Sequence, residues 1–575
     1  MTMFRHVYGI ARRALHPPGE LVRLSPRALG WILYVLKWLR FAYRTRVKPL
    51  MRKVRASVIP IVIVGGGCYL LSLQIRTAAS ARLILVVGSL LFVALMMARL
   101  DVSLLALMVI SATIMYPSAV PRPFSFGGAG FNTGELFLIF TLFVGFLKAC
   151  VSRRKVSSPL TLPVLAFFLS VLVAFYVSYR TYLADPRGSF EFSATYNAGR
   201  PLFYYAYFFA ILYGLRSLRE YRLFFVMTAA LACLVASMVF AQYILGSKVA
   251  LFFGTPEGQS FAGELTKSGE PIRTGVTRVQ PPGIPLNLAM LFVMLCMASQ
   301  YRGRIGARYT VIASILAAGV VFSFARNAWI STIVATALLL VVTPLRSKGR
   351  LAAIIVGAAV GAILFSFAVA AVTPRRSVAL KNALAERFLS IVQTRRTSSE
   401  PSVENRRYEN RAALRLALRQ PVFGLGLRTT IKQTYEWVPT ARGMRMVPLS
   451  TYMIHNSYLD MWVHYGLLGV LSFAAISITF LYRAFSLWRR AEEYWVKSIG
   501  LGFALGYVTL LIRSVVVMTL LHQLWEITVA AYMWGMVEAG FLLAVKPKES
   551  PASAAELPAP ATSHAYRTRT GALVS

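Results

Sequence analysis

The sequence predicts an all-α polytopic integral membrane protein with about fourteen (12–14) transmembrane helices, and three observations support this class. Hydrophobic residues make up 57% of the 575 residues, and charged residues only 14%, against roughly 25% in soluble domains. Apolar runs of about 18 to 20 residues recur along the chain, each long enough to cross a hydrocarbon core about 30 Å thick. The basic residues fall mostly between these runs.

The apolar runs divide the chain into five parts. A basic segment occupies residues 1–56, with thirteen Lys or Arg and one acid. Eleven expected spans follow within 57–373, then one large loop at 374–456, then three spans within 457–545. The tail at 546–575 is rich in Pro, Ala and Ser, a composition typical of disorder. The spans are expected near residues 57–74, 82–99, 103–120, 134–151, 159–181, 201–216, 223–245, 283–300, 309–325, 327–344, 351–373, 457–482, 496–513 and 524–545.

The basic residues also predict which side of the membrane each loop faces. With the N-terminal segment in the cytoplasm, five basic clusters between spans fall on the cytoplasmic side, as the positive-inside rule requires. Both termini are then cytoplasmic, and the longer loops, including 374–456, lie on the opposite side. The clusters are Arg153-Arg154-Lys155, Arg216/Arg219/Arg222, Arg302/Arg304/Arg308, Arg346/Lys348/Arg350 and Arg483/Arg489/Arg490.

The net charge of +41 would indicate nucleic acid in a soluble protein. Here membrane topology explains most of it, so we expect the lipid bilayer and no nucleic acid as a partner. The large loop is the exception, because it holds fifteen Lys or Arg against five Glu on the translocated side. This cluster predicts an anionic ligand such as phosphate, diphosphate or an acidic glycan. The alternative is a basic composition shared by all the loops.

Part of the large loop is expected to be helical. In the stretch SVENRRYENRAALRLALRQPVFGLG, Leu414, Ala417 and Leu418 share one face of an amphipathic helix. The helix should end before Pro421, and a glycine-containing turn should follow.

Ionisable groups beside membrane spans are costly and are therefore candidates for function. Arg326, Arg278 and Arg200 each stand at the expected outer end of a span. Each could bind an anionic substrate. The alternative is an arginine at a helix end that extends its charge into water.

The pair His455–Asn456 lies where the large loop enters a span. An imidazole titrates near neutrality and can accept a proton from a hydroxyl. Asn456 could cap the helix, hold the imidazole or contact substrate. Asp460 could orient His455 only through an irregular turn. The alternative for the pair is a capping and interface role without chemistry.

Motifs of soluble enzymes are absent from the sequence, including the P-loop, HExxH and GxSxG. We expect neither a metal nor a cofactor. The four cysteines lie in or beside apolar runs without CxxC spacing, so they are not expected to form disulfides or metal sites. His522 and Glu526, spaced i, i+4, could pair with each other.

Three segments resemble the O-antigen ligase and polymerase superfamily, and they occur in the family order. HNSYLDMWVHYGLLGVL resembles its His-Asn signature. RAALRLALRQPVFGLGL resembles the arginine-containing helix of its large periplasmic loop. FSFARNAWISTIVATALLLVV resembles its Ser-Arg-Gly-Ala-Trp span, with Ala325 and Asn327 beside the arginine in place of Ser and Gly. RVQPPGIPLNLAM is a looser match to a fourth segment.

The resemblance implies metal-independent glycosyl transfer at the periplasmic face of the bacterial inner membrane. The donor would be a glycan on undecaprenyl diphosphate, and the acceptor a sugar hydroxyl. His455 would be the general base. Arg326 and Arg278, helped by Arg411 and Arg415, would hold the diphosphate.

Several functions share this chemistry. We favour a polymerase of exopolysaccharide or O-antigen repeat units, with a flippase and a chain-length regulator as candidate partners. A ligase would instead transfer the glycan to lipid A-core, and a third branch glycosylates protein hydroxyls. A flippase for lipid-linked sugars is the alternative from another class, but the two halves of the chain show no convincing repeat.

Overall fold

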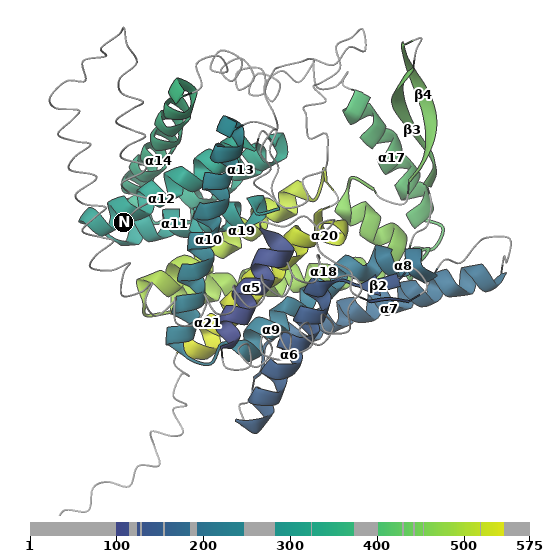
Figure 1. The fold of residues 1–575 in the computed structure, drawn as a ribbon, viewed down its shortest axis with the longest axis horizontal. Helices are drawn as coiled ribbons and strands as arrows, with labels where there is room; N and C mark the ends of the chain where they lie inside the picture. The colour runs from purple at the N-terminus through teal and green to yellow at the C-terminus, as the bar shows by residue number, and fades with distance from the viewer. Residues whose placement is uncertain are drawn as a thin grey trace, which may run out of the picture. The chain divides into compact units, whose positions relative to one another are not determined.

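A computed structural model describes residues 99–113, 124–126, 129–152, 156–184, 192–245, 282–323, 325–372, 401–427, 431–440, 443–451, 454–517 and 519–545. The chain divides into two compact units, Met1–Arg99 and Leu100–Ser575. The described part of the second unit is mainly helical (Figure 1).

The first half of this unit contains six α-helices and one 3₁₀ helix among the described residues. They are α5 (Leu100–Ala112), α6 (Thr133–Val151), α7 (Thr161–Ala184), α8 (Phe192–Gly199), the 3₁₀ helix η3 (Arg200–Ala206), α9 (Tyr207–Gly214) and α10 (Leu218–Leu245). The second half contains α11 (Ile284–Gln300), α12 (Gly303–Phe322), α13 (Arg326–Val342), α14 (Leu345–Val372), α17 (Pro401–Ala417), α18 (Ser457–Arg490), α19 (Tyr494–Arg513), α20 (Thr519–His522) and α21 (Leu524–Ala544).

Length and composition support a multi-pass membrane protein. Among the described residues, eight helices are long and apolar enough to cross a bilayer, and α5, α11 and α13 are shorter apolar helices. The predicted count of fourteen remains a prediction, because the spans at 57–74 and 82–99 lie outside the described residues. The expected span at 201–216 differs from prediction. Its first part is the 3₁₀ helix η3, which has Pro201 in its first turn, and α9 follows.

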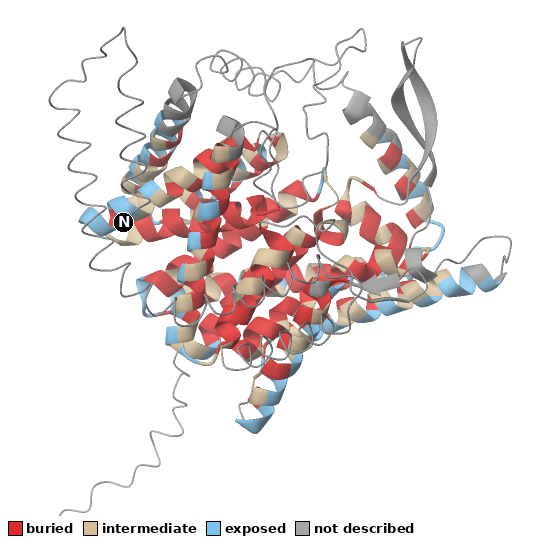
Figure 2. Ribbon diagram, in the orientation of Figure 1, coloured by how far each residue is buried: buried red, intermediate tan, exposed pale blue. Residues whose placement is uncertain are grey.

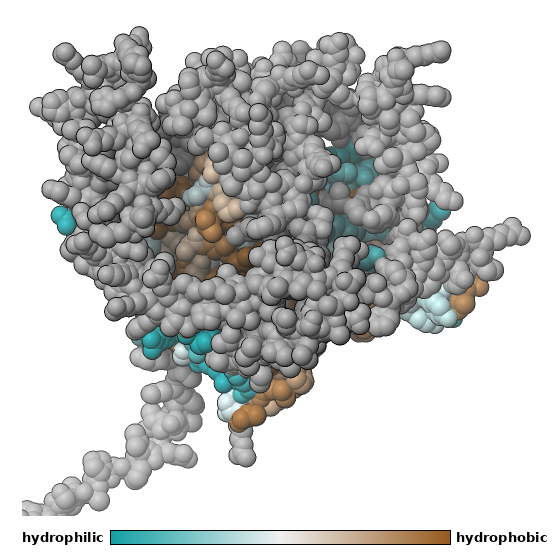
Figure 3. All heavy atoms as spheres, in the orientation of Figure 1, coloured by the Kyte–Doolittle hydropathy of each residue, from teal (hydrophilic) through white to brown (hydrophobic). Residues whose placement is uncertain are grey.

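Burial separates central helices from peripheral ones. Within the apolar windows, 83% of α21 and 78% of α19 are buried, against 22% of α7 and 17% of α14. Figure 2 shows this contrast, with blue exposed residues along α6, α7 and α14. The exposed residues of α6 and α7 include many large apolar side chains, and Figure 3 shows apolar surface at the ends of both helices. Such a surface is suited to contact with lipid.

The central helices α11 and α19 pack closely through small residues. A Cβ placed on Gly506 would lie 2.8 Å from the Cα of Ala289, and a Cβ on Gly502 would overlap the backbone of Val293. Glycine therefore allows the two backbones to approach, as is common where membrane helices meet. These contacts also show that the two helices are antiparallel.

Two short hairpins lie among the helices. Strands β1 (Phe124–Phe126) and β2 (Ala129–Phe131) form one antiparallel pair. Strands β3 (Ile431–Thr440) and β4 (Gly443–Thr451) form the other, with Trp437 opposite Met446. The second hairpin lies between α17 and α18 and contacts α17 (Figure 1). The large loop is therefore part helix and part hairpin.

Helix α18 is broken at Gly466, whose φ of +66° is favourable only for glycine. The turn that follows α17 fits against this break. The backbone N–H of Leu467 donates to the carbonyl oxygen of Pro421 at 2.7 Å, and that of Leu425 donates to Val463 at 2.7 Å. The predicted glycine turn is confirmed, with positive φ at Gly424 and Gly426.

Candidate functional site

His455 stands immediately before α18, at the end of the large loop. Asn456 is the N-cap of α18, and its side-chain oxygen accepts hydrogen bonds from the backbone N–H groups of Tyr458 and Leu459 at 3.1 and 3.2 Å. Of the roles considered for Asn456, the structure shows the cap. The His455 side chain is 42% exposed, so the cap presents an accessible imidazole at the end of a membrane helix.

A buried carboxylate holds this imidazole. Glu409 of α17 is 5% exposed, and its carboxylate lies 2.9 Å from Nδ1 of His455. The same carboxylate accepts the backbone N–H of His455 at 3.1 Å. Glu409 thus contacts the histidine at both its ring and its backbone.

The buried face of α17 explains how Glu409 reaches His455. Ala413 and Ala417, four and eight residues after Glu409, are fully buried and pack against Ile454 and Val463. Residues at this spacing lie on one face of a helix, so the carboxylate is in line with the apolar contact.

The buried face of α17 differs from the predicted one. Leu414 and Leu418 are 42% and 61% exposed, so the prediction was right for Ala417 and wrong for these two leucines. The alanines pack against Ile454 and Val463, and their small side chains allow α17 to lie close to this surface. The two leucines lie on the outer side of the helix.

The outer side of α17 carries arginines. Arg411 and Arg415 are both exposed, as are Arg407 and Arg419. Arg407, Arg411 and Arg415 are spaced by four residues and form a basic stripe along the helix, and Arg419 follows two residues after the helix ends. Arg411 is two residues after Glu409 and therefore lies on the opposite side of α17 from the carboxylate that contacts His455. A role for Arg411 and Arg415 in binding an anion stays a prediction.

Arg326 is the first residue of α13 and is half-buried. The turn before it is short: Ser323 is the C-cap of α12, and its hydroxyl accepts the backbone N–H of Ala325. Trp329 ties the two helices together by donating from Nε1 to the carbonyl oxygen of Val320 at 3.2 Å. Helix α13 packs on α19, which in turn borders the start of α18.

The other two predicted arginines are Arg200 and Arg278. Arg200 is buried and forms an ion pair with Glu135, which also caps α6 through a reciprocal bond with Asn132. Its charge is therefore already compensated, and a role in substrate binding remains a prediction. Arg278 lies outside the described residues.

Beneath His455, Asp460 is the centre of a buried polar network. Its carboxylate lies 2.6 Å from Nε2 of His522 and 3.2 Å from Nε2 of His464, and it accepts the backbone N–H of Ile454 at 3.3 Å. Nδ1 of His464 lies 2.8 Å from the carbonyl oxygen of Gly426. Asp460 therefore contacts the backbone next to His455, rather than its ring.

The expected pair His522–Glu526 is wrong. His522 binds Asp460, and Glu526 forms an ion pair with Arg513 of α19 at 2.6 Å. The two residues are on different helices, α20 and α21, so the i, i+4 rule for a continuous helix does not apply.

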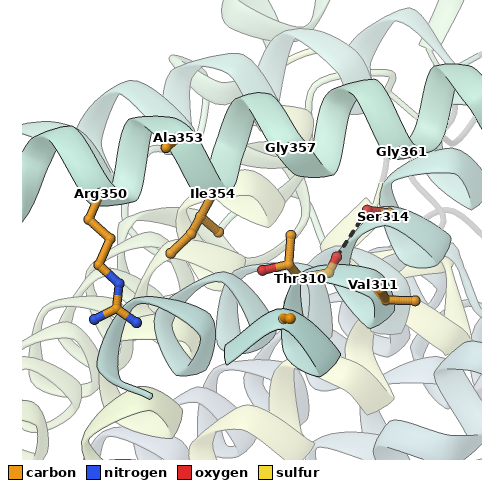
Figure 4. Close-up of a pocket in the computed structure, with 9 residues that line it drawn as sticks. Thr310, Val311, Ser314, Arg350, Ala353, Ile354, Gly357 and Gly361 are labelled. Carbon is orange, nitrogen blue, oxygen red and sulfur yellow. Dashed lines mark hydrogen bonds between the residues drawn. The ribbon is translucent and has the colours of Figure 1, made fainter. Parts of the chain in front are cut away.

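A separate hollow of about 480 Å³ lies between α12 and α14. Small residues form it, including Thr310, Ser314, Gly357 and Gly361, and Arg350 lies at one end (Figure 4). Arg350 donates to the carbonyl oxygens of Ala298 and Tyr301. Most of the lining surface of this hollow is apolar, and the lining includes none of the residues described around His455.

These features define a helical membrane protein with an imidazole–carboxylate pair at a helix mouth. A family model described as "O-Antigen ligase" matches residues 311–474, from α12 into α18. The match covers less than a third of the chain, includes Arg326, Glu409 and His455, and supports an O-antigen ligase-like family, as the sequence resemblance predicted. Glycan transfer of the ligase or polymerase type is the activity that this family implies. No curated protein matches the chain.

The sequence did not predict the roles of Glu409 and His464, or that Asp460 contacts two histidines. A signal existed for Glu409, because a carboxylate in phase with a helix's buried alanines needs a buried partner. No comparable local signal existed for the contact between Asp460 and His522, which are 62 residues apart.

Proposed function

We propose that this protein transfers a glycan from undecaprenyl diphosphate to a sugar hydroxyl at the periplasmic face of the bacterial inner membrane, polymerising repeat units of an exopolysaccharide or O-antigen. The observation that carries the proposal is the accessible imidazole of His455, held by Glu409 at the head of a membrane helix within the family match. A lipid-linked donor must approach from the bilayer, and a helix mouth is where it would arrive.

In the proposed reaction, His455 accepts the proton of the acceptor hydroxyl as that oxygen attacks the anomeric carbon. The bond between this carbon and the diphosphate oxygen breaks, and the diphosphate leaves on its lipid. Cations near the leaving group stabilise the charge that develops. Arg326 and the exposed Arg411 and Arg415 are the candidates for this role, with Arg278 as a further candidate from the sequence. Because a diphosphate is a good leaving group, one base and positioned cations suffice without a metal.

A ligase is the second candidate function, and the description of the matched family favours it. The ligase would use the same residues but transfer the completed glycan to lipid A-core. The two functions differ in the intermediate that accumulates when the enzyme is inactive. A polymerase leaves single lipid-linked repeats, whereas a ligase leaves full-length lipid-linked polymer.

The first test replaces His455 by alanine in the source strain and compares surface polysaccharide, lipopolysaccharide and lipid-linked glycans with those of a deletion strain. We expect glycan loss equal to that of the deletion, since a general base contributes about 10²- to 10⁴-fold to a rate. Membrane levels of the variant serve as the control for folding. Near-normal glycan from a well-folded variant would contradict the proposed mechanism.

A further inference from the structure

We propose that Glu409 is the positioning residue that sets the protonation of His455, so that Nε2, and not Nδ1, is the atom that accepts the substrate's proton. This inference rests on the proposed function. It goes beyond it by assigning the reacting atom and by giving a role to a buried carboxylate of the large loop.

The first step is the hydrogen-bond geometry. Nδ1 of His455 lies 2.9 Å from Oε2 and 3.2 Å from Oε1 of Glu409. An ionised carboxylate only accepts hydrogen bonds. A neutral imidazole carries one ring proton, so that proton must be on Nδ1, and Nε2 is left with its lone pair.

The second step is burial. The Glu409 side chain is 7% exposed, whereas that of His455 is 42% exposed. The carboxylate is thus on the protein side of the ring, and the accessible part of the imidazole faces away from it. A buried carboxylate is retained only where it has hydrogen-bond partners, and His455 supplies two of them, at the ring and at the backbone.

The third step is charge. When Nε2 takes a proton, the ring becomes an imidazolium, and its new positive charge lies beside the Glu409 carboxylate. This pairing stabilises the protonated ring during transfer, as the aspartate does in a serine-protease triad.

The structural alternative is that Glu409 merely fastens α17 to the start of α18. The two roles predict different kinetics. A fastening residue affects folding and all ligands together. A residue that acts through His455 lowers the catalytic rate constant and has no further effect on activity once His455 is absent.

The experiment measures transfer by membranes that contain the full chain, with lipid-linked repeat units extracted from the deletion strain as the donor. The variants are Glu409→Gln, Glu409→Asp, His455→Ala and the double variant with Glu409→Gln and His455→Ala. The matched control is Glu492→Gln, the same change at an exposed position beyond the other end of α18.

We expect Glu409→Gln to lower kcat by about 10²-fold with little change in KM. Glu409→Asp should recover part of this loss because it keeps the carboxylate. Adding Glu409→Gln to His455→Ala should not lower the residual rate further. The Glu492→Gln control should behave like the unaltered protein.

Two results would overturn the inference while leaving the proposed function intact. One is normal kcat in Glu409→Gln when His455→Ala is inactive. The other is a loss of kcat in Glu409→Gln that Glu409→Asp does not relieve, together with a lower melting temperature. This melting temperature would fall by the same amount when Glu409→Gln is added to His455→Ala. If His455→Ala itself is fully active, the proposed mechanism with His455 as the base fails, independently of Glu409.

Discussion

At the scale of residues, the candidate site depends on buried carboxylates that each serve several partners. Glu409 binds the ring and backbone of His455. Asp460 binds the backbone of Ile454 and two histidines. His464 faces an acceptor at each ring nitrogen, the Gly426 carbonyl and the Asp460 carboxylate. The ring of His464 therefore links the turn after α17 to the buried carboxylate of α18.

Replacing Asp460 by asparagine should therefore destabilise the protein by about 2 to 5 kcal/mol. The Asp460 carboxylate faces three N–H groups, from the backbone of Ile454 and the rings of His464 and His522. An asparagine amide has one oxygen that accepts and one NH₂ group that donates, so at least one of these buried N–H groups loses its acceptor. Thermal unfolding of the purified protein in detergent measures the effect, and Glu492→Gln at an exposed position is the control. An unchanged melting temperature would show that Asp460 is not the hub of this network.

At the scale of elements, the site is assembled by docking the turn after α17 into the break of α18. Gly466 permits this contact in two ways. Its φ is +66°, and a Cβ there would overlap the carbonyl of Val422. The N–H groups that the break leaves without helical partners, at Leu467 and Leu468, donate to Pro421 and Val422. The GLLG stretch of the His-Asn signature is thus a docking site for the loop that carries Glu409.

Gly466→Ala should release this turn. A positive φ costs a residue with a Cβ about 1 kcal/mol or more, and the overlap with Val422 adds to it. We expect faster proteolysis within 401–427, a lower melting temperature and loss of glycan transfer. Gly349→Ala in α14 is a suitable control, because an added Cβ there meets nothing within 4 Å. Unchanged proteolysis in Gly466→Ala would contradict the docking role.

At the scale of the whole molecule, apolar length predicted the helices well and long-range partners poorly. The expected span at 134–151 coincides with α6 to within a residue, because a run of apolar residues encodes a membrane helix locally. The pairing of His455 with Glu409, 46 residues earlier, depends on how α17 docks, and neither residue's neighbours in sequence specify it. The His522–Glu526 prediction was wrong because the chain breaks between α20 and α21. The β3–β4 hairpin was not predicted, because no turn motif was identified between its two strands.

The orientation of the protein in the membrane is testable through α18. After the break at Gly466, the remaining 24 residues of this helix (467–490) extend about 36 Å at 1.5 Å per residue, so the break and the C-terminal end must lie on opposite sides of a bilayer. The basic residues Arg483, Arg489 and Arg490 near its C-terminal end predict that this end is cytoplasmic. His455 is then periplasmic, as transfer from a translocated lipid-linked glycan requires.

In a chain whose four cysteines are replaced by serine, a single cysteine at Thr440, at the end of β3, should react with a membrane-impermeant maleimide added to intact spheroplasts. A single cysteine at Glu492, beyond the other end of α18, should react only after permeabilisation. The cysteines at the two positions serve as controls for each other, since they are expected on opposite sides of the membrane. The opposite labelling pattern would place His455 in the cytoplasm, where a translocated donor cannot reach it, and the proposed site would have to be abandoned.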